Sequence, residues 1–178
     1  MGSQQVLLVN TNRMRPPIAP LALEYIGAAI QAVGHQARVL DLCFADDADK
    51  ATADAFAGKR TDLVAVTFRN TDDCYFASRR SFVEILATDV QRIRQYYDGP
   101  IVVGGGGFSL MPVALLNCVD ADYGVRGDGE VALIELLRAL SGEIQLSAVP
   151  GLVHRADDGW HLVPKTLARP VLTTNRAL

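Results

Sequence analysis

Three short apolar segments of this chain are each followed at once by residues that can bind a ligand. Segment 63–68 leads into Arg69-Asn70-Thr71-Asp72, segment 101–103 into four glycines at 104–107, and segment 123–125 into Arg126-Gly127-Asp128-Gly129-Glu130. Arginine and amide groups bind anions and amides, and glycines let a flat or bulky ligand approach the backbone. If the three segments are parallel strands, these residues meet at one edge of a sheet, where open α/β folds bind ligands. The pattern predicts one large ligand that contacts all three strand ends.

The elements that would position these residues alternate between strands and helices. Short apolar runs predict strands at 6–9, 37–42, 63–68, 101–103 and 123–125, and helical periodicity predicts helices at 21–33, 48–56, 81–97, 112–117 and 130–140. Such alternation is typical of parallel βαβ units with right-handed crossovers. We therefore expect an α/β fold with a doubly wound, Rossmann- or flavodoxin-like, parallel five-stranded sheet.

The alternation of predicted strands and helices ends after Ser141. Runs at 150–155 and 160–164 flank Ala156-Asp157-Asp158-Gly159, which predicts a C-terminal β-hairpin. We expect an α/β domain over 1–148, a hairpin extension over 149–165 and a linker over 166–178.

The composition limits the classes of function. The 178 residues are 49% hydrophobic and 21% charged, with a formal charge of −3 and a pI near 5.5. These values disfavour a nucleic-acid partner that binds through bulk positive charge. No apolar stretch approaches the roughly 20 residues that span a membrane, and residues 1–5 do not begin a signal peptide. We therefore expect a cytoplasmic protein with no membrane partner.

The cysteines and histidines predict no metal site. Cys43, Cys74 and Cys118 are far apart in sequence, so neither a disulfide framework nor a zinc or iron–sulfur cluster is expected. The three histidines lack metal-ligand spacing, and no arrangement of a nucleophile with a histidine base stands out.

Each candidate residue has a structural interpretation beside the functional one. The glycines at 104–107 can form a plain turn or pack closely on a neighbouring element, although ligand approach is favoured, and no helix is expected before Pro112. Arg69 is either a surface cation, a partner of Asp72 or Asp73, or a ligand contact. Glu130 either caps the last helix or binds a sugar hydroxyl.

Several segments together resemble the N-terminal cobalamin-binding domain of B12-dependent radical SAM enzymes, especially the methyltransferases. The resemblance covers nearly the whole chain. It is carried by the proline-rich first loop that runs into 20–29, and by 34–41, 103–105, 121–130 and 149–153. Arg69-Asn70 and the stretch 107–112 look most like the tryptophan methyltransferases of thiopeptide biosynthesis.

The resemblance implies a cofactor, with two informative departures. The family holds cobalamin at the C-terminal edge of a doubly wound sheet. The Asp-x-His-x-x-Gly motif that supplies a cobalt-ligating histidine in methionine-synthase-like domains is absent, and the comparable loop is Asn12-Arg13-Met14-Arg15-Pro16-Pro17. This implies base-off binding without a protein histidine on cobalt. The CxxxCxxC motif is absent too, which implies that S-adenosylmethionine and the [4Fe-4S] cluster belong to a radical SAM catalytic domain outside this chain.

The implied activity is transfer of a methyl group from S-adenosylmethionine, via methylcobalamin, to a carbon centre such as tryptophan C2. This chain alone would bind cobalamin without catalysing the transfer. Arg69 is the implied catalytic residue, beneath the cobalt, because a guanidinium cannot ligate it. The implied cofactor-binding residues are Asn10, Pro17, Leu21, Thr67, Arg69, Asn70, Gly104, Gly105, Gly106, Gly107, Phe108, Ser109, Val125, Arg126, Gly127 and Glu130.

Two other classes of function remain open on the residues alone. A flavodoxin-like module for a flavin or nucleotide, such as a sensor, would carry a phosphate-binding loop after the first strand. The prolines of the first loop disfavour that alternative. A partner-docking domain without a cofactor is disfavoured by the glycines and polar residues at the strand ends.

Overall fold

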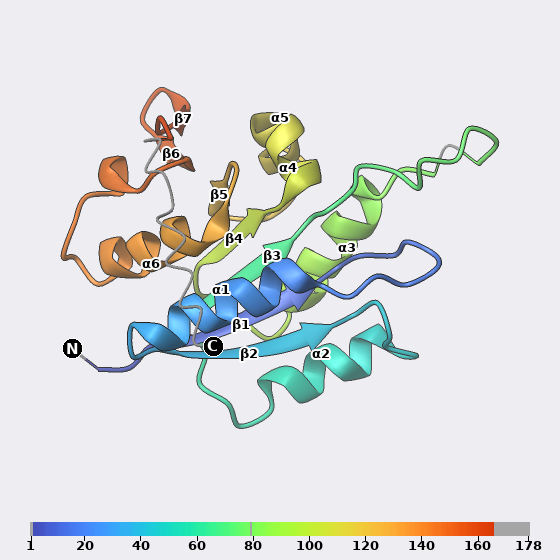
Figure 1. Cartoon of the computed structure of the whole chain (residues 1–178), viewed down its shortest axis with the longest axis horizontal. Helices are drawn as coiled ribbons and strands as arrows, with labels where there is room; N and C mark the ends of the chain where they lie inside the picture. The colour runs from blue at the N-terminus through green and yellow to red at the C-terminus, as the bar shows by residue number, and fades with distance from the viewer. Residues whose placement is uncertain (1, 79, 166–178) are drawn as a thin grey trace, which may run out of the picture.

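The strands form one mixed sheet in the order β2-β1-β3-β4-β5-β6-β7 (Figure 1). The computed structural model describes residues 2–78 and 80–165. The strands are β1 (Gln5–Asn10), β2 (Gln36–Asp41), β3 (Leu63–Thr67), β4 (Ile101–Gly104), β5 (Tyr123–Val125), β6 (Leu152–Ala156) and β7 (Gly159–Leu162). The first five pair in parallel, and β6 and β7 continue the same sheet as an antiparallel hairpin. The predicted α/β fold and the C-terminal hairpin are confirmed, with the parallel strands in the flavodoxin order 2-1-3-4-5.

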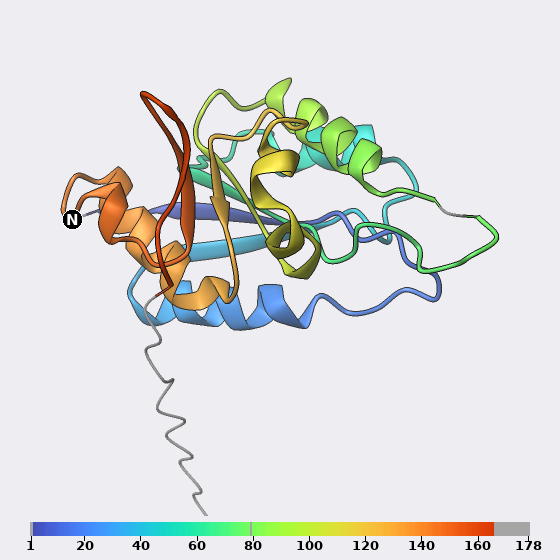
Figure 2. The ribbon, with the colours of Figure 1, turned by 90° about the horizontal axis from the view of Figure 1, so that it is seen from above.

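Helices cover both faces of the sheet (Figure 2). One face carries α1 (Leu21–Ala32) and α6 (Gly129–Leu140), and the other carries α2 (Ala48–Phe56), α3 (Val83–Arg94) and α5 (Pro112–Leu116). A 3-10 turn (Leu146–Ala148) leads into the hairpin. Alternate residues of β1 supply the two cores, since Leu7 and Val9 face α3 while Val6 and Leu8 face α1. A strand buried on both sides needs such a continuous apolar run.

The glycine run is where the structure differs from the sequence prediction. A short helix, α4 (Gly106–Leu110), begins inside the run, whereas no helix was expected before Pro112. Gly105 turns the chain with a φ of +108°, and the Gly107 and Phe108 amides then donate to the carbonyls of Arg69 (2.7 Å) and Phe68 (3.2 Å). The helix therefore forms because the segment after β3 accepts its first amides, a long-range contact that no local pattern announces.

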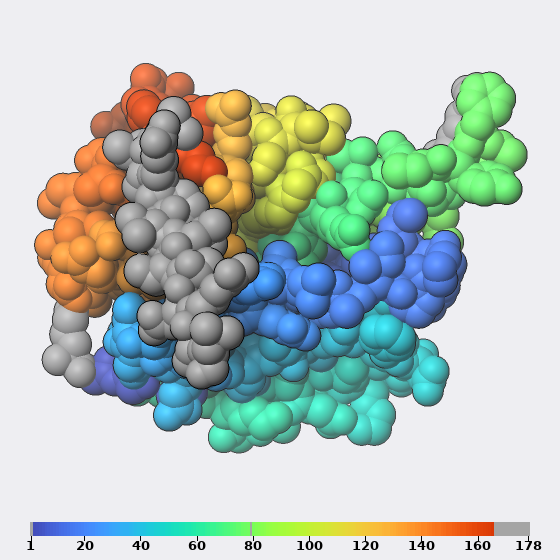
Figure 3. All heavy atoms as spheres, viewed as in Figure 1, coloured from blue at the N-terminus to red at the C-terminus, as the bar shows by residue number. Residues whose placement is uncertain are grey.

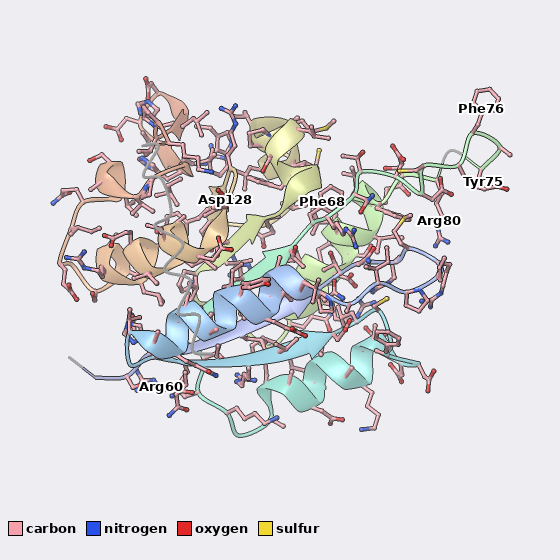
Figure 4. All side chains as sticks on the ribbon, viewed as in Figure 1. Arg60, Phe68, Tyr75, Phe76, Arg80 and Asp128 are labelled. Carbon is pink, nitrogen blue, oxygen red and sulfur yellow. The ribbon has the colours of Figure 1, made fainter. Side chains whose placement is uncertain are left out.

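The connection from β3 to α3 projects from the body as an arm (Figure 3). Asp72 and Ser81 form a β-bridge at its base, and the Asp73 amide donates to the Arg80 carbonyl. The Tyr75 and Phe76 side chains near its tip are 71% and 85% exposed (Figure 4). Among the described residues, no helix has the length and apolar character needed to cross a bilayer.

Candidate functional site

Four strand ends form one row at the C-terminal edge of the sheet. Asn10 of β1 pairs in register with Thr67 of β3, Thr67 pairs with Gly104 of β4, and Gly104 pairs with Val125 of β5. The sequence had singled out all four as cofactor-binding candidates. Because the strands are parallel and in register, whatever follows each strand is delivered to the same edge.

A cavity of about 320 Å³ lies below this row, between the sheet and the two helices α1 and α6. Its wall is mainly apolar because Leu23 and Ile26 of α1, Leu133 of α6 and Val102 of β4 face it. Its few polar side chains are Thr67 at the end of β3, Ser109 of α4, and Asp128 and Glu130 at the start of α6. The predicted site residues in its lining are Thr67, Gly104, Gly105, Gly106, Ser109, Val125, Gly127 and Glu130.

A second cavity of about 290 Å³ adjoins the first and opens beside the first loop. The two share Ala22, Leu23, Thr67, Gly105 and Gly106 as lining residues. The second is also bounded by Asn10, Asn12, Pro20, Leu21 and Arg69. Together the cavities extend from the first loop, past the glycines, to the start of α6.

The glycine run serves packing and cavity shape at once. A Cβ atom on Gly105 would lie 2.7 Å from the Phe68 carbonyl oxygen, and one on Gly107 would lie 3.0 Å from the Asn70 carbonyl carbon. These two glycines are therefore required by the close approach of the segment after β3. Gly104, Gly105 and Gly106 also line the cavities, so this stretch of wall carries no side chains.

Hydrogen bonds hold the polar groups of this edge in place. The Asn10 side chain donates to Asp41 (2.8 Å) and accepts from the Asn12 amide (3.1 Å), which braces the start of the first loop. The Ser109 hydroxyl donates to the Gly105 carbonyl and accepts from the Gly127 amide, both at 2.9 Å. Ser109 thus joins α4 to the turn before α6.

Arg69 and Glu130 have no such partners among the residues that the structure describes. The Arg69 side chain is exposed and makes no ion pair with Asp72, Asp73 or any other residue of the described part of the chain. Glu130 is the second residue of α6, and no side-chain hydrogen bond caps that helix. The capping and salt-bridge alternatives are therefore not what the structure shows, and both side chains border the cavities.

Five predicted site residues border neither the first nor the second cavity. Phe108 is fully buried in the opposite core against Gly124, where a Cβ atom would lie 2.1 Å from the Phe108 ring. Gly107 is buried beneath the segment after β3, and Pro17 is exposed in the first loop. The Asn70 side-chain oxygen is buried without a hydrogen-bond partner in the described residues. Arg126 borders a third cavity, beside Ser109 and Gly127.

Sequence reasoning missed the helix residues of the cavity wall. Ala22, Ile26 and Leu133 border the first cavity, together with Asp128 and Gly129 of the segment 126–130 that the sequence had already singled out. Ile26 and Leu133 belong to the apolar stripes that were attributed to core packing, and the stripe alone does not show where the core has a gap. The small side chain of Ala22, in the first turn of α1, was the feature of the sequence that could have indicated this gap.

A buried ion-pair network ties the first loop to the opposite face. The Arg13 guanidinium contacts Asp89 of α3 at 3.0 and 3.2 Å, and Asp89 also pairs with Arg92 at 2.5 Å. Arg92 in turn pairs with Asp49 of α2. The Asp89 side chain is only 2% exposed, and burial raises its pKa although both guanidinium groups oppose that shift. The network fixes where the loop leaves β1.

All three histidines lie away from the cavities. His35 precedes β2, where its ring accepts from the Gln4 amide at the opposite edge of the sheet. His154 and His161 face each other across the hairpin, with ring centroids 6.0 Å apart, and His154 pairs with Tyr123 at the start of β5. No imidazole is therefore available at the row of strand ends.

Known proteins resemble this chain in both fold and sequence. A family model described as the B12 binding domain matches residues 8–137. The chain belongs to the B12-binding domain family. Over 137 residues it is 43% identical to tryptophan 2-C-methyltransferase of Streptomyces laurentii. The matched residues make up 76% of this chain and 23% of that protein.

Solved structures agree with this assignment. The radical S-adenosylmethionine methyltransferase TsrM from Kitasatospora setae, with cobalamin and a [4Fe-4S] cluster bound, matches 93% of this chain with a TM-score of 0.86 and 41% identity. The match covers 30% of that chain. The radical enzyme OxsB, at 17% identity and a TM-score of 0.71, shares the fold. The resemblance to B12-dependent radical SAM methyltransferases is confirmed, and the chain spans less than a third of each of these three proteins.

The residues present fit cobalamin. A glycine-walled opening at the strand ends admits a bulky group to the edge, and the mainly apolar cavity between the sheet and α1 can take an aromatic base. The residues that would hold the cofactor are those of the two adjoining cavities, with Arg69 at the mouth of the second.

Proposed function

We propose that this chain holds cobalamin for a B12-dependent radical SAM methyltransferase that transfers a methyl group from S-adenosylmethionine to a carbon centre. The observation that carries the proposal is the in-register row of Asn10, Thr67, Gly104 and Val125 above two adjoining cavities. The 43% identity to a tryptophan 2-C-methyltransferase makes C2 of tryptophan the first acceptor to test. Bound cobalamin would supply the cobalt centre that carries the methyl group.

In this proposal the nucleotide tail of cobalamin occupies the first cavity, away from the cobalt. Leu23, Ile26 and Leu133 would pack on the dimethylbenzimidazole base, while Thr67 and Glu130 would face its ribose and amide groups. The absence of side chains at Gly104–Gly106 would let the tail pass the edge of the sheet. The remote positions of the three histidines support base-off binding without a protein imidazole.

Arg69 would lie beneath the lower face of the corrin ring. It directly follows β3 and Phe68, borders the second cavity and makes no ion pair within the described residues. A guanidinium stays protonated and has no available lone pair, so it would fill the lower axial position without ligating cobalt. Keeping water and imidazole from that position is the role we assign to it.

The remaining chemistry would come from a partner domain. S-adenosylmethionine and the [4Fe-4S] cluster would bind in a radical SAM domain, since this chain spans 23% of its methyltransferase relative. The segment 166–178, predicted as the linker to that domain, lies outside the described residues.

Two spectroscopic experiments on the 178-residue chain test the proposal. The protein is mixed with hydroxocobalamin, desalted, and examined by visible absorption, with flavin mononucleotide as the rival ligand. We expect a stoichiometric base-off cobalamin spectrum and no retained flavin. Loss of all corrinoid on desalting would refute cobalamin binding.

Electron paramagnetic resonance of the Co(II) form addresses Arg69. We expect no superhyperfine splitting from a nitrogen nucleus in the unmodified protein. The variant Arg69→His should introduce such splitting if the side chain lies under the cobalt. Nitrogen splitting in the unmodified protein would contradict the assignment.

A further inference from the structure

We propose that Arg126 and Lys165 bind the phosphodiester of the cobalamin tail, in a third cavity beside the tail cavity. The inference rests on the proposed function and adds the recognition of the one anionic group in the tail. It also gives a role to the Pro150-Gly151 segment and the hairpin, which the site described so far does not use.

The third cavity measures about 390 Å³ and adjoins the first, since Ser109 and Gly127 line both. Arg126 and Lys165 lie on its wall, together with Gly151 and the end of the hairpin at Leu162–Pro164. The first cavity, by contrast, is bordered by Asp128 and Glu130 and by no cation. A phosphate would be repelled by Glu130, which has no ion-pair partner among the described residues, and attracted to the neighbouring space, where the guanidinium and the ammonium lie.

Of the two cations that border the third cavity, Arg126 is the one without an ion-pair partner in the described residues. Lys165 pairs with Asp128 at 2.6 Å, so these two charges offset each other. Arg126 makes no ion pair within the described residues, which leaves an excess of one positive charge. A guanidinium can donate two parallel hydrogen bonds to a phosphate, and Lys165 has further ammonium hydrogens to offer.

The backbone at Arg126 is held in place before any ligand arrives. Its amide donates to the Gly151 carbonyl at 2.9 Å. Gly151 has a φ of +72°, and a Cβ atom there would lie 2.6 Å from the Arg126 carbonyl oxygen. The segment before β6 therefore needs glycine at this position in order to press against Arg126, which explains the Pro150-Gly151 pair in the sequence.

Gly127 has a matching reason. It has a φ of +92°, and a Cβ atom there would lie 2.9 Å from the Lys165 ammonium nitrogen. The absence of a side chain lets Lys165 cross the turn and reach the cavity. The Ser109 hydroxyl is already occupied as donor to Gly105 and acceptor from Gly127, so it braces the turn and leaves anion binding to the two cations.

The test compares three corrinoids that differ only in the tail. Cobalamin carries phosphodiester and base, cobinamide phosphate carries phosphate without base, and cobinamide carries neither. Their dissociation constants are measured by equilibrium dialysis, all as Co(II), for the 178-residue chain and for Arg126→Gln. We expect the substitution to weaken cobalamin and cobinamide phosphate about tenfold each, as loss of a charge-assisted contact would. Cobinamide should bind with unchanged affinity, which also shows that the variant is folded.

Two further variants sharpen the result. Arg126→Lys should retain part of the affinity, because it keeps the charge and loses the paired hydrogen bonds. Arg60→Gln removes one positive charge before β3, near the opposite edge and well separated from Asp128 in Figure 4, and should change none of the three constants.

The outcomes separate this inference from the proposed function. If the unmodified chain binds cobinamide and cobinamide phosphate equally, or if Arg126→Gln weakens all three corrinoids alike, phosphate recognition is refuted while cobalamin binding stands. If the unmodified chain retains no corrinoid, both are refuted.

Discussion

The two edges of the parallel sheet use polar residues in opposite ways. At the N-terminal edge, Asp62 accepts from the Gln5 amide and Asp122 accepts from the Ile101 amide, both at 2.8 Å. Arg94 donates to Asp122, to the Gly99 carbonyl and to the Asp120 carbonyl. The two carboxylates join the starts of neighbouring strands, and Arg94 joins α3 to the loops before β4 and β5.

At the C-terminal edge, three charged side chains have no partner among the described residues. Arg69, Arg126 and Glu130 follow β3 and β5 and make no ion pair or side-chain hydrogen bond within the described residues. Glycines replace side chains in the wall, and cavities replace packed atoms. One edge therefore uses its charged groups within the fold, whereas the other leaves three of them without a partner in the described residues, as we expect of an edge that binds a ligand.

The largest expected effect is at Gly105. The change Gly105→Ala forces a side chain into a φ of +108° and against the Phe68 carbonyl, so we expect the free energy of unfolding to fall by about 4 kcal/mol. Urea denaturation measures this loss. The matched control is Gly142→Ala, which has a φ of +82° and no atom within 4 Å of the added Cβ, and should cost about 1 kcal/mol. Equal losses in the two variants would mean that close packing of the glycine run is unimportant.

Breaking the buried network should have the next largest effect. Asp89→Asn leaves Arg13 and Arg92 without their shared carboxylate, and we expect a loss of about 3 kcal/mol. Because Arg13 anchors the first loop, hydrogen exchange of residues 11–20 should also accelerate. An unchanged exchange rate there would show that the loop is held by other contacts.

A direct comparison of the edges uses two arginines. Arg94→Met removes three hydrogen-bond partners from a side chain that is 17% exposed, and should cost about 2 kcal/mol. Arg69→Met removes no such partner, so its unfolding free energy should stay within about 0.5 kcal/mol while cobalamin retention falls. A comparable loss of stability in both variants would erase the distinction between the edges.

Tyr97 is an exception at the N-terminal edge. Its hydroxyl is buried without a hydrogen-bond partner in the described residues, so Tyr97→Phe should raise the free energy of unfolding by about 1 kcal/mol. Burial also raises the pKa of Tyr97, so above a pH of about 10 the unfolded chain loses this proton first and stability declines. The decline should be smaller in Tyr97→Phe, although it should persist in part because burial raises the pKa of Tyr123 too. Identical pH profiles would contradict this account.

The fold, the family and the row of strand ends could all be predicted from the amino-acid sequence. Short apolar runs that alternate with helical stripes predict a parallel sheet, and parallel strands in register bring Asn10, Thr67, Gly104 and Val125 into one row. Side-chain periodicity is a local property, so each strand and helix could be predicted from its own segment, whereas the family followed from the resemblance of several segments to known proteins.

Which of these residues face a cavity depends on how the elements pack in three dimensions. Phe108 lies in the core rather than at the ligand edge, because α4 forms against the segment after β3. Arg13 is held by Asp89, 76 positions away, and Gly127 leaves room for Lys165 across the hairpin. Contacts between residues so far apart in sequence depend on how whole elements pack, and no local pattern encodes that packing.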